Sequence, residues 1–160
     1  MAWFHNYLSG RTQSVSVNGS YSDTSDLSVG VPQGSVLGPI LFIVFINDLL
    51  GVVPHCKIVL YADDTSLFFA RRNIQAIQSV LQEDLTAVGE WFSLKSLLVN
   101  YGKTNVMLFG PKQGLARSQG PSLFFLGKLL ELSNTVKYLS LIFDASIWTG
   151  MNTLITFLIK

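Results

Sequence analysis

Hydrophobic and polar positions form their clearest pattern over residues 57–69, KIVLYADDTSLFF. Two runs rich in β-branched and aromatic residues flank the adjacent pair Asp63 and Asp64, and this arrangement predicts a β-hairpin with both carboxylates at its tip. Because both runs are apolar on both faces, we expect the hairpin to be central, inside a layered domain rather than at its edge.

Two longer stretches predict helices. Residues 40–50, ILFIVFINDLL, are apolar nearly all round until Asn47, and Pro39 suits a first helical turn, so we expect a buried helix that ends near residue 50. From residue 74 onward, apolar residues recur on one helical face. This spacing predicts an amphipathic helix that begins after Asn73 as its N-cap and reaches about residue 98.

Shorter patterns predict the remaining strands. Near the start of the chain, Asn18-Gly19 is a strong turn signal between a short strand at residues 13–17 and a weaker return strand at residues 21–29. Residues 111–121 form a loop of Pro, Gly and basic residues. Around that loop we expect a strand at residues 104–110, a hairpin that turns at Gly127-Lys128, and a single strand at residues 135–143.

The segment before the first long helix, GVPQGSVLGP at residues 30–39, predicts a shaped loop. Gly30 and Gly34 allow the backbone to approach a ligand or another segment closely, and Gln33 offers both a donor and an acceptor. An ordinary connection into a helix is the alternative interpretation of this loop.

Composition narrows the class of protein. The 160 residues suffice for one domain, and 49% hydrophobic with only 13% charged residues excludes a disordered chain. A net charge of +1 predicts no broad basic surface for gripping a duplex. The single cysteine, Cys56, excludes an internal disulfide. The start of the chain shows no secretory leader, and the longest apolar run has eleven residues, so we expect an intracellular protein that is neither secreted nor membrane-spanning.

Two neighbouring carboxylates repel each other unless a cation lies between them. Hard divalent cations such as Mg²⁺ bind one or two carboxylates together with substrate phosphates, and two such metals can stabilise a phosphoryl transfer. Asp63 and Asp64 are therefore candidate metal ligands. The alternative is that an aspartate simply suits a turn.

The motifs together resemble a known family. GVPQGSVLGPILF is followed by an apolar helix ending in Asn-Asp-Leu and then by YADD at residues 61–64; further along come Trp91, Asn100, Lys103-Thr104, the triplet at residues 137–139, Asp144 and Trp148. This ordered set is similar to the reverse transcriptase domain of non-LTR, LINE-type retrotransposons of the jockey-like kind, and it covers residues 3 to about 148.

The resemblance implies roles for individual residues. Asp63 would bind the metal directly with Asp64 as its helper, and the metal would be Mg²⁺ or Mn²⁺. Tyr61 would lie near the nucleotide and the primer end, and Gln33 and Gly34 would line the nucleotide and template pocket. Lys103 would be a general acid for the pyrophosphate leaving group, with a solvated lysine as an equal alternative. Tyr138 and Leu139 resemble a primer-grip hairpin, with core strand residues as the alternative.

The resemblance also implies a fold and partners. We expect an α+β polymerase palm, an antiparallel sheet with helices packed on one face, divided into a partial palm domain at residues 1–110 and the end of the palm with a truncated start of the thumb at residues 111–160. The partners would be an RNA template, a DNA primer and deoxynucleotides, and the location would be the nucleus or the cytoplasm.

Departures from the family pattern favour a second hypothesis. The family has a third catalytic aspartate on an earlier strand, and neither Asp23 nor Asp26 follows an apolar strand that could supply it. We expect the fingers and most of the thumb to be missing, and Ser140 stands where the family usually has glycine. The isolated chain is therefore expected to be an inactive retroelement relic, at most a weak nucleic-acid binder, unless missing segments or a partner chain complete it. A membrane-associated apolar protein is a third, remote option.

Overall fold

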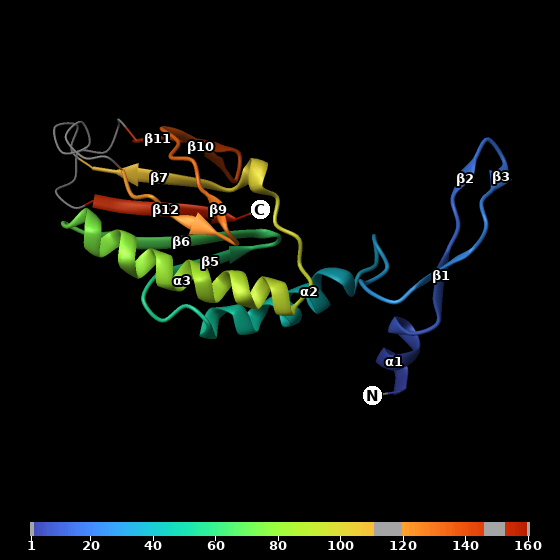
Figure 1. Ribbon diagram of the computed structural model, residues 1–160. Helices are drawn as coiled ribbons and strands as arrows, with labels where there is room; N and C mark the ends of the chain where they lie inside the picture. Colours follow the sequence, from blue (N-terminus) through green and yellow to red (C-terminus); the bar gives the residue numbers. More distant parts are fainter. Residues whose placement is uncertain (1, 111–119, 146–152, 160) are drawn as a thin grey trace. The chain divides into compact units, whose positions relative to one another are not determined.

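The computed structural model describes residues 2–110, 120–145 and 153–159 (Figure 1). The chain divides into two compact units, residues 1–45 and residues 46–160. The loop expected at residues 111–121 falls largely outside the described residues, and so does Trp148. Helices and antiparallel strands both contribute, which confirms the α+β class.

The unit of residues 1–45 is built from a short helix and narrow two-stranded ribbons. Asn18 and Gly19 both have positive φ, 51° and 82°, which matches the tight hairpin turn that Asn-Gly favours and confirms that turn. The strands that continue the ribbon pair antiparallel. Its elements are α1 (Ala2–Leu8), β1 (Arg11–Gln13), β2 (Ser16–Val17), β3 (Ser20–Tyr21) and β4 (Ser25–Leu27).

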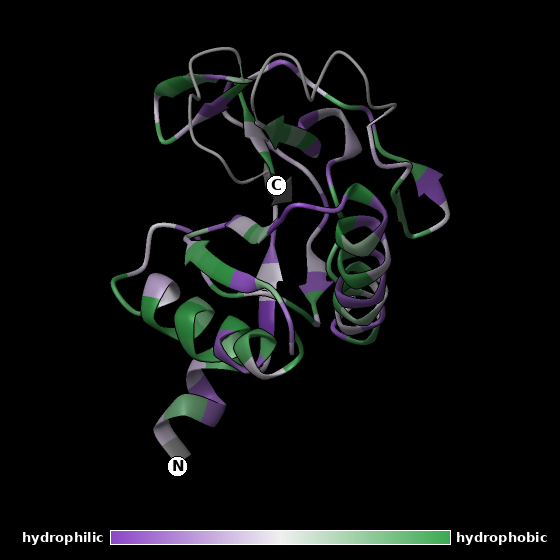
Figure 2. Cartoon of the chain, turned by 90° about the vertical axis from the view of Figure 1, so that its left-hand side faces the viewer, coloured by the Kyte–Doolittle hydropathy of each residue, from purple (hydrophilic) through white to green (hydrophobic). Residues whose placement is uncertain are grey.

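Helix α2 (Gly38–Ile46) has Pro39 in its first turn, as expected, and continues as the 3₁₀ helix η1 (Asn47–Gly51). Figure 2 shows α2 as hydrophobic along its length. The prediction of a buried helix is nevertheless wrong, because four apolar side chains are exposed: Ile40, Ile43, Val44 and Phe45. The boundary between the two units falls within this helix.

The unit of residues 46–160 contains a four-stranded antiparallel sheet in the order β5-β6-β12-β7. The predicted hairpin is β5 (Lys57–Tyr61) and β6 (Asp64–Arg71). Strand β6 lies in the interior, but β5 is an edge strand of the described sheet with alternating exposure, so the expectation of a central hairpin is wrong for β5. The two strands have similar hydrophobic sequences. Pairing with β12 gives β6 a neighbouring strand on both sides, whereas β5 pairs only with β6 in the described sheet.

Strand β12 (Thr153–Ile159) pairs antiparallel with β6 on one side and with β7 (Asn105–Phe109) on the other. Strands β6 and β7 therefore run parallel, and helix α3 connects them across the face of the sheet (Figure 1). A parallel connection with an additional strand between its two members is a split βαβ arrangement. The sheet thus joins residues on both sides of position 110, and the division into domains at that position stays a prediction.

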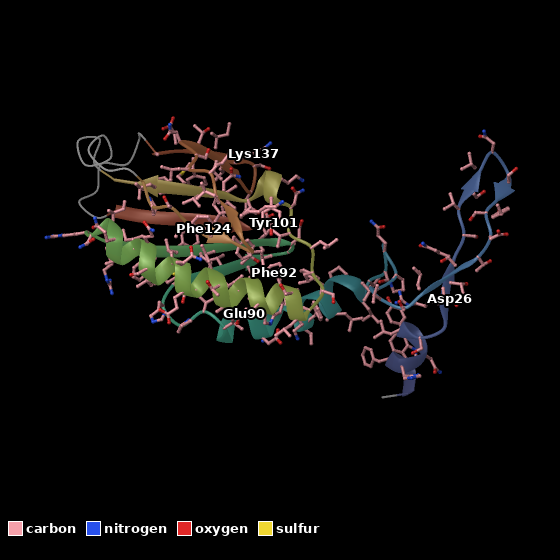
Figure 3. The ribbon with its side chains drawn as sticks, in the orientation of Figure 1. Asp26, Glu90, Phe92, Tyr101, Phe124 and Lys137 are labelled. Atoms are coloured by element: carbon pink, nitrogen blue, oxygen red, sulfur yellow. The ribbon has the colours of Figure 1, made fainter. Side chains whose placement is uncertain are left out.

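Helix α3 (Ile74–Leu94) begins after Asn73, whose side-chain oxygen accepts hydrogen bonds from the backbone N–H groups of Gln75 and Ala76. This confirms the predicted N-cap. The helix ends a few residues earlier than expected. Its apolar face packs on the sheet and on strand β8, and Figure 3 shows Phe92 and Phe124 at this side of the unit. The fully buried members of the face are Ile77, Leu81, Leu85 and Val88.

The later hairpins complete the unit. Strands β8 (Phe124–Phe125) and β9 (Lys128–Leu129) turn at Leu126-Gly127, one residue before the predicted turn. Residues 135–143 are not one strand, as their apolar pattern suggested, but the hairpin of β10 (Thr135–Tyr138) and β11 (Leu141–Asp144). In the described part of the chain, no helix is both long enough and apolar enough to cross a membrane.

Candidate active site

The tip of the β5–β6 hairpin is a two-residue turn, Ala62-Asp63, because Tyr61 and Asp64 still pair with each other. Ala62 has a φ of 50°, in the left-handed region that glycine normally occupies in such a turn. The two neighbouring carboxylates therefore have different surroundings: Asp63 is exposed in the turn, whereas Asp64 is only 9% exposed at the start of β6.

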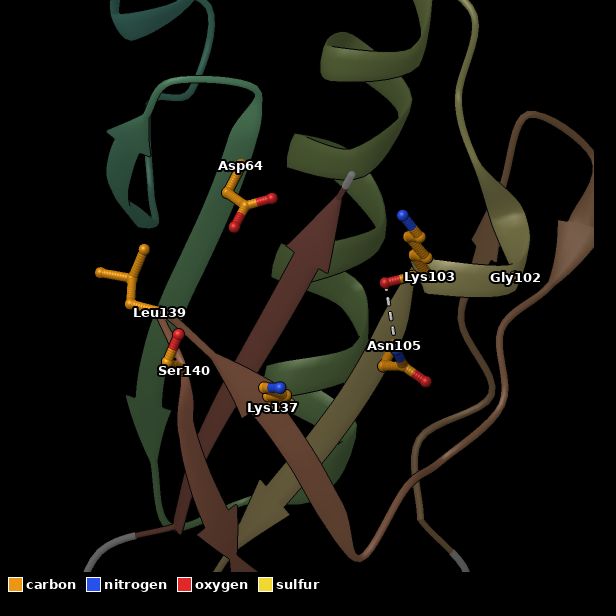
Figure 4. Close-up of a pocket in the computed structure, with 7 residues that line it drawn as sticks. All are labelled: Asp64, Gly102, Lys103, Asn105, Lys137, Leu139 and Ser140. Atoms are coloured by element: carbon orange, nitrogen blue, oxygen red, sulfur yellow. Dashed lines mark hydrogen bonds between the residues drawn. The ribbon is translucent and has the colours of Figure 1, made fainter.

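Asp64 opens onto a cavity of about 470 Å³ that also receives Lys103 (Figure 4). Figure 4 shows that the charged side chains come from three separate elements: Asp64 from β6, Lys103 from the segment before β7, and Lys137 from β10. The lining consists of Asp64, Gly102, Lys103, Asn105, Lys137, Leu139 and Ser140. Polar and charged groups from distant parts of the sequence thus meet at one end of the sheet.

Lys103 is held by a tightly bonded turn, the 3₁₀ helix η2 (Tyr101–Lys103). Its backbone N–H donates to the carbonyl of Asn100, and its own carbonyl accepts from the side-chain amide of Asn105 at 3.0 Å. The Thr104 hydroxyl also donates to the Asn100 carbonyl, at 2.9 Å. These bonds fix the backbone of Lys103 while its ammonium group stays at the cavity.

The β10–β11 hairpin presents its two faces to different surroundings. Val136 and Tyr138 pack with the core cluster that contains Met107 and Phe109. Successive residues of a strand point to opposite faces, so Lys137 lies on the other face of β10. Lys137 and the turn residue Leu139 both line the cavity. The structure therefore separates the expected primer-grip pair: Leu139 lies at the cavity and Tyr138 against the core.

The other expected site residues lie elsewhere. Tyr61 is 60% exposed at the end of β5, next to the turn that carries Asp63. Gln33 and Gly34 are exposed in the loop before α2, and Gly34 has a φ of 79° that explains its glycine. They belong to the unit of residues 1–45, whereas the carboxylates belong to residues 46–160.

A buried carboxylate fixes the start of the hairpin. Asp84 on α3 is fully buried and accepts hydrogen bonds from the backbone N–H groups of His55 and Cys56, at 3.3 and 2.7 Å, and it contacts His55 Nδ1 at 3.0 Å. The bond to Asp84 raises the pKa of His55 above its usual value. Burial, followed by the bond to Asp84, raises the pKa of the Cys56 thiol, which therefore stays protonated.

Asp84 and Lys137 are functional candidates that sequence reasoning missed. Asp84 did carry a signal, because it lies on the apolar face of α3 between Leu81 and Leu85, where an acidic side chain needs buried partners. Lys137 belongs to the triplet that supports the family resemblance, but an alternating strand gives no indication of which cavity its polar face meets.

The residues present fit a divalent cation in part. Asp63 and Asp64 supply adjacent oxygen ligands of the kind that Mg²⁺ or Mn²⁺ takes. Among the described residues, no group of three His, Cys, Asp or Glu side chains is arranged to hold a metal ion. Mg²⁺ usually takes its remaining ligands from phosphate or water oxygens.

Comparison with known proteins relates this arrangement to one family. The family described as "Reverse transcriptase (RNA-dependent DNA polymerase)" matches residues 1–143. The chain is 34% identical over 145 residues, 86% of its length, to "RNA-directed DNA polymerase from mobile element jockey" of Drosophila melanogaster, and it covers 15% of that protein.

Other relatives give a consistent result. "Probable RNA-directed DNA polymerase from transposon BS" of Drosophila melanogaster is 33% identical over 90% of the chain, and the jockey protein of Drosophila funebris is 32% identical over 88%. The chain spans only 16% of the length of each of these two relatives. No solved structure matches it significantly.

Proposed function

Because this chain belongs to the reverse transcriptase family, we propose that its α+β body is part of a polymerase palm. It would serve the template-directed addition of deoxynucleotides to a primer 3′ hydroxyl, with RNA as the template. The observation that carries this proposal is the hairpin tip, where the turn residue Asp63 is followed by Asp64, which lines a cavity together with Lys103.

Asp63 and Asp64 would hold the divalent metal, Mg²⁺ or Mn²⁺, and the metal would supply charge stabilisation for the phosphoryl transfer. Exposure of Asp63 in the turn suits direct binding of a metal, and Asp64 adds a second carboxylate at the wall of the cavity. Two-metal chemistry needs more ligands than this pair provides, so a third acidic group from other segments or a partner chain belongs to the proposal.

The remaining roles are those that the family resemblance implies. Lys103 would donate a proton to the pyrophosphate leaving group, since η2 holds it on the far side of the cavity from Asp64 (Figure 4). Tyr61 would contact the nucleotide and the primer end, and Leu139 would contact the primer. Gln33 and Gly34 would line the nucleotide and template pocket from the loop before α2.

Primer extension tests this function. The purified 160-residue protein is given a DNA primer on an RNA template with deoxynucleotides, in Mg²⁺ and then in Mn²⁺. Extension that Asp63→Ala lowers by about a hundredfold or more, the scale of losing one charge-stabilising group, would support catalysis by this chain alone. Asp26→Ala is the matched control, because Asp26 is also an exposed aspartate but lies on β4. Extension that survives Asp63→Ala would overturn the proposal.

A second candidate function is nucleic-acid binding without catalysis. It is favoured by the described residues themselves, which bring two carboxylates and no third acidic group to the hairpin tip. Absence of extension from folded protein, together with salt-dependent binding of the primer–template, would support this candidate. Fluorescence anisotropy with a labelled primer–template measures that binding directly.

A further inference from the structure

Lys137 is the charged residue of the cavity for which the proposed function gives no role. It lies on β10, whereas Lys103 lies at the end of η2 and Asp64 on β6, so the three charges belong to separate elements of one unit. Figure 4 shows Lys137 and Lys103 on different parts of the wall, with Asp64 on a third. Two lysines that line one cavity favour an anionic ligand.

The direction of Lys137 is fixed by its neighbours in the strand. Val136 is buried, and Tyr138 packs against the same core cluster, so these two residues anchor one face of β10. The register with β11 pairs Lys137 with Ile142, and the tight turn at Leu139-Ser140 follows at once. Lys137 must therefore point away from the core, on the face that lines the cavity.

The two lysines of the lining have no carboxylate partner among the described residues. In the described part of the chain, neither Lys103 nor Lys137 forms a salt bridge; the two ion pairs found there join His55 with Asp84 and Lys95 with Asp48. Two ammonium groups that share one cavity without carboxylate partners repel each other, and an anion between them removes that repulsion. An anion with two or more charges fits best.

We propose that Lys137 and Lys103 together form a phosphate-binding site of this cavity, with Lys137 as a binding residue. The identity of the phosphate rests on the proposed function: it belongs either to the triphosphate of the incoming nucleotide or to the backbone of the primer. Asp64 lies across the cavity, so a metal held by Asp63 and Asp64 would share the same phosphate oxygens.

Binding of inorganic triphosphate to the whole 160-residue protein, measured by isothermal titration calorimetry without added metal, tests the site. We expect Lys137→Gln to weaken binding by about tenfold, the effect of losing one charge-assisted hydrogen bond, and Lys137→Arg to keep most of it. Lys57→Gln is the matched control, because Lys57 is an exposed strand lysine outside the cavity. Circular dichroism establishes that each variant is folded.

Two results would overturn the site. One is unchanged triphosphate binding in Lys137→Gln, and the other is an equal loss in Lys57→Gln, which would mean that only the overall charge matters. Because this measurement needs no catalysis, the site can stand even when primer extension fails.

A second measurement identifies the source of the phosphate. A raised Kd for a deoxynucleoside triphosphate in Lys137→Gln, with unchanged affinity for the primer–template, supports the triphosphate. The reverse result supports the primer backbone. If neither affinity changes, the phosphate does not come from a polymerase substrate, and the assignment of the site to this reaction is overturned.

Discussion

The two units of the chain differ in what holds them together. Residues 46–160 enclose a core between α3 and the sheet, with fully buried side chains such as Leu67, Ile77 and Leu81. Among the described residues of the first unit, Gly38 alone is buried. That unit is held by turn geometry, by strand pairing, and by Arg11, whose guanidinium donates to the carbonyls of Leu8 and Gly30 at 3.0 and 2.6 Å.

Local turn preferences and tertiary burial therefore stabilise the two units separately. Asn18-Gly19 forms its hairpin with no core beneath it, because the backbone preference of the turn suffices to set the register. In the second unit, the cavity and its charges depend on three elements held by shared packing. We therefore expect substitutions in the core of residues 46–160 to affect the whole site, and substitutions in the ribbon to stay local.

The largest expected effect comes from Leu81→Ala. Leu81 is fully buried on α3, and such a truncation destabilises by about 3 kcal/mol through lost burial and the cavity left behind. Urea unfolding followed by circular dichroism measures the change. The control on the same helix is Leu94→Ala, since Leu94 is 83% exposed. Val17→Ala in the ribbon, at 62% exposure, should also leave the midpoint nearly unchanged. Equal shifts of the urea midpoint in Leu81→Ala and Val17→Ala would contradict this difference between the two units.

An intermediate effect is expected at Asp84. Asp84→Ala leaves the buried N–H of Cys56 and the part-buried N–H of His55 without their acceptor, and we expect a loss of about 2 kcal/mol. The same substitution also removes a pH dependence of the folding stability. The pKa of His55 is raised in the folded state by Asp84, so this pair stabilises fully below about pH 6.5 and the contribution is lost as the pH rises through the folded pKa.

Thermal unfolding from pH 5 to pH 9 tests the linkage. The wild-type melting temperature should fall relative to that of His55→Gln as the pH rises above 6.5, because His55→Gln keeps the acceptor for the backbone but removes the titrating ring. Parallel pH profiles of the two proteins would show that this ion pair does not contribute.

The smallest effect is expected at the turn of the β10–β11 hairpin. Ser140 has a φ of 69° and Leu139 a φ of 47°, both in the region that costs a non-glycine residue free energy. Ser140→Gly should stabilise by about 0.5–1 kcal/mol, after the greater entropy of glycine in the unfolded chain is subtracted. Ser140→Ala keeps the strain and serves as the control. No gain in the urea midpoint for Ser140→Gly would contradict the strained turn.

At Ser140 the family usually has glycine. The positive φ at this position is the physical reason why glycine suits it. The hairpin at this point could not be read from the pattern of residues 135–143, because apolar residues continue through the turn without an Asn, Gly or Pro to interrupt them.

Several features were determined by the sequence alone. Asn73 begins α3, Asn18-Gly19 turns the first ribbon, and the YADD residues form a hairpin tip, because capping and turn formation act within a few neighbouring residues. The family also followed from the ordered motifs, which preserve spacing along the chain.

Other features of the fold and of the site depend on the tertiary structure. It placed β12 between β6 and β7, made β5 an edge strand, left α2 exposed, and brought Lys137 to the cavity of Asp64 and Lys103. Strand order, the covering of an apolar face and the meeting of charges depend on segments far apart in the chain. Hydrophobic periodicity states which face of an element is apolar, but it does not state which partner that face will meet.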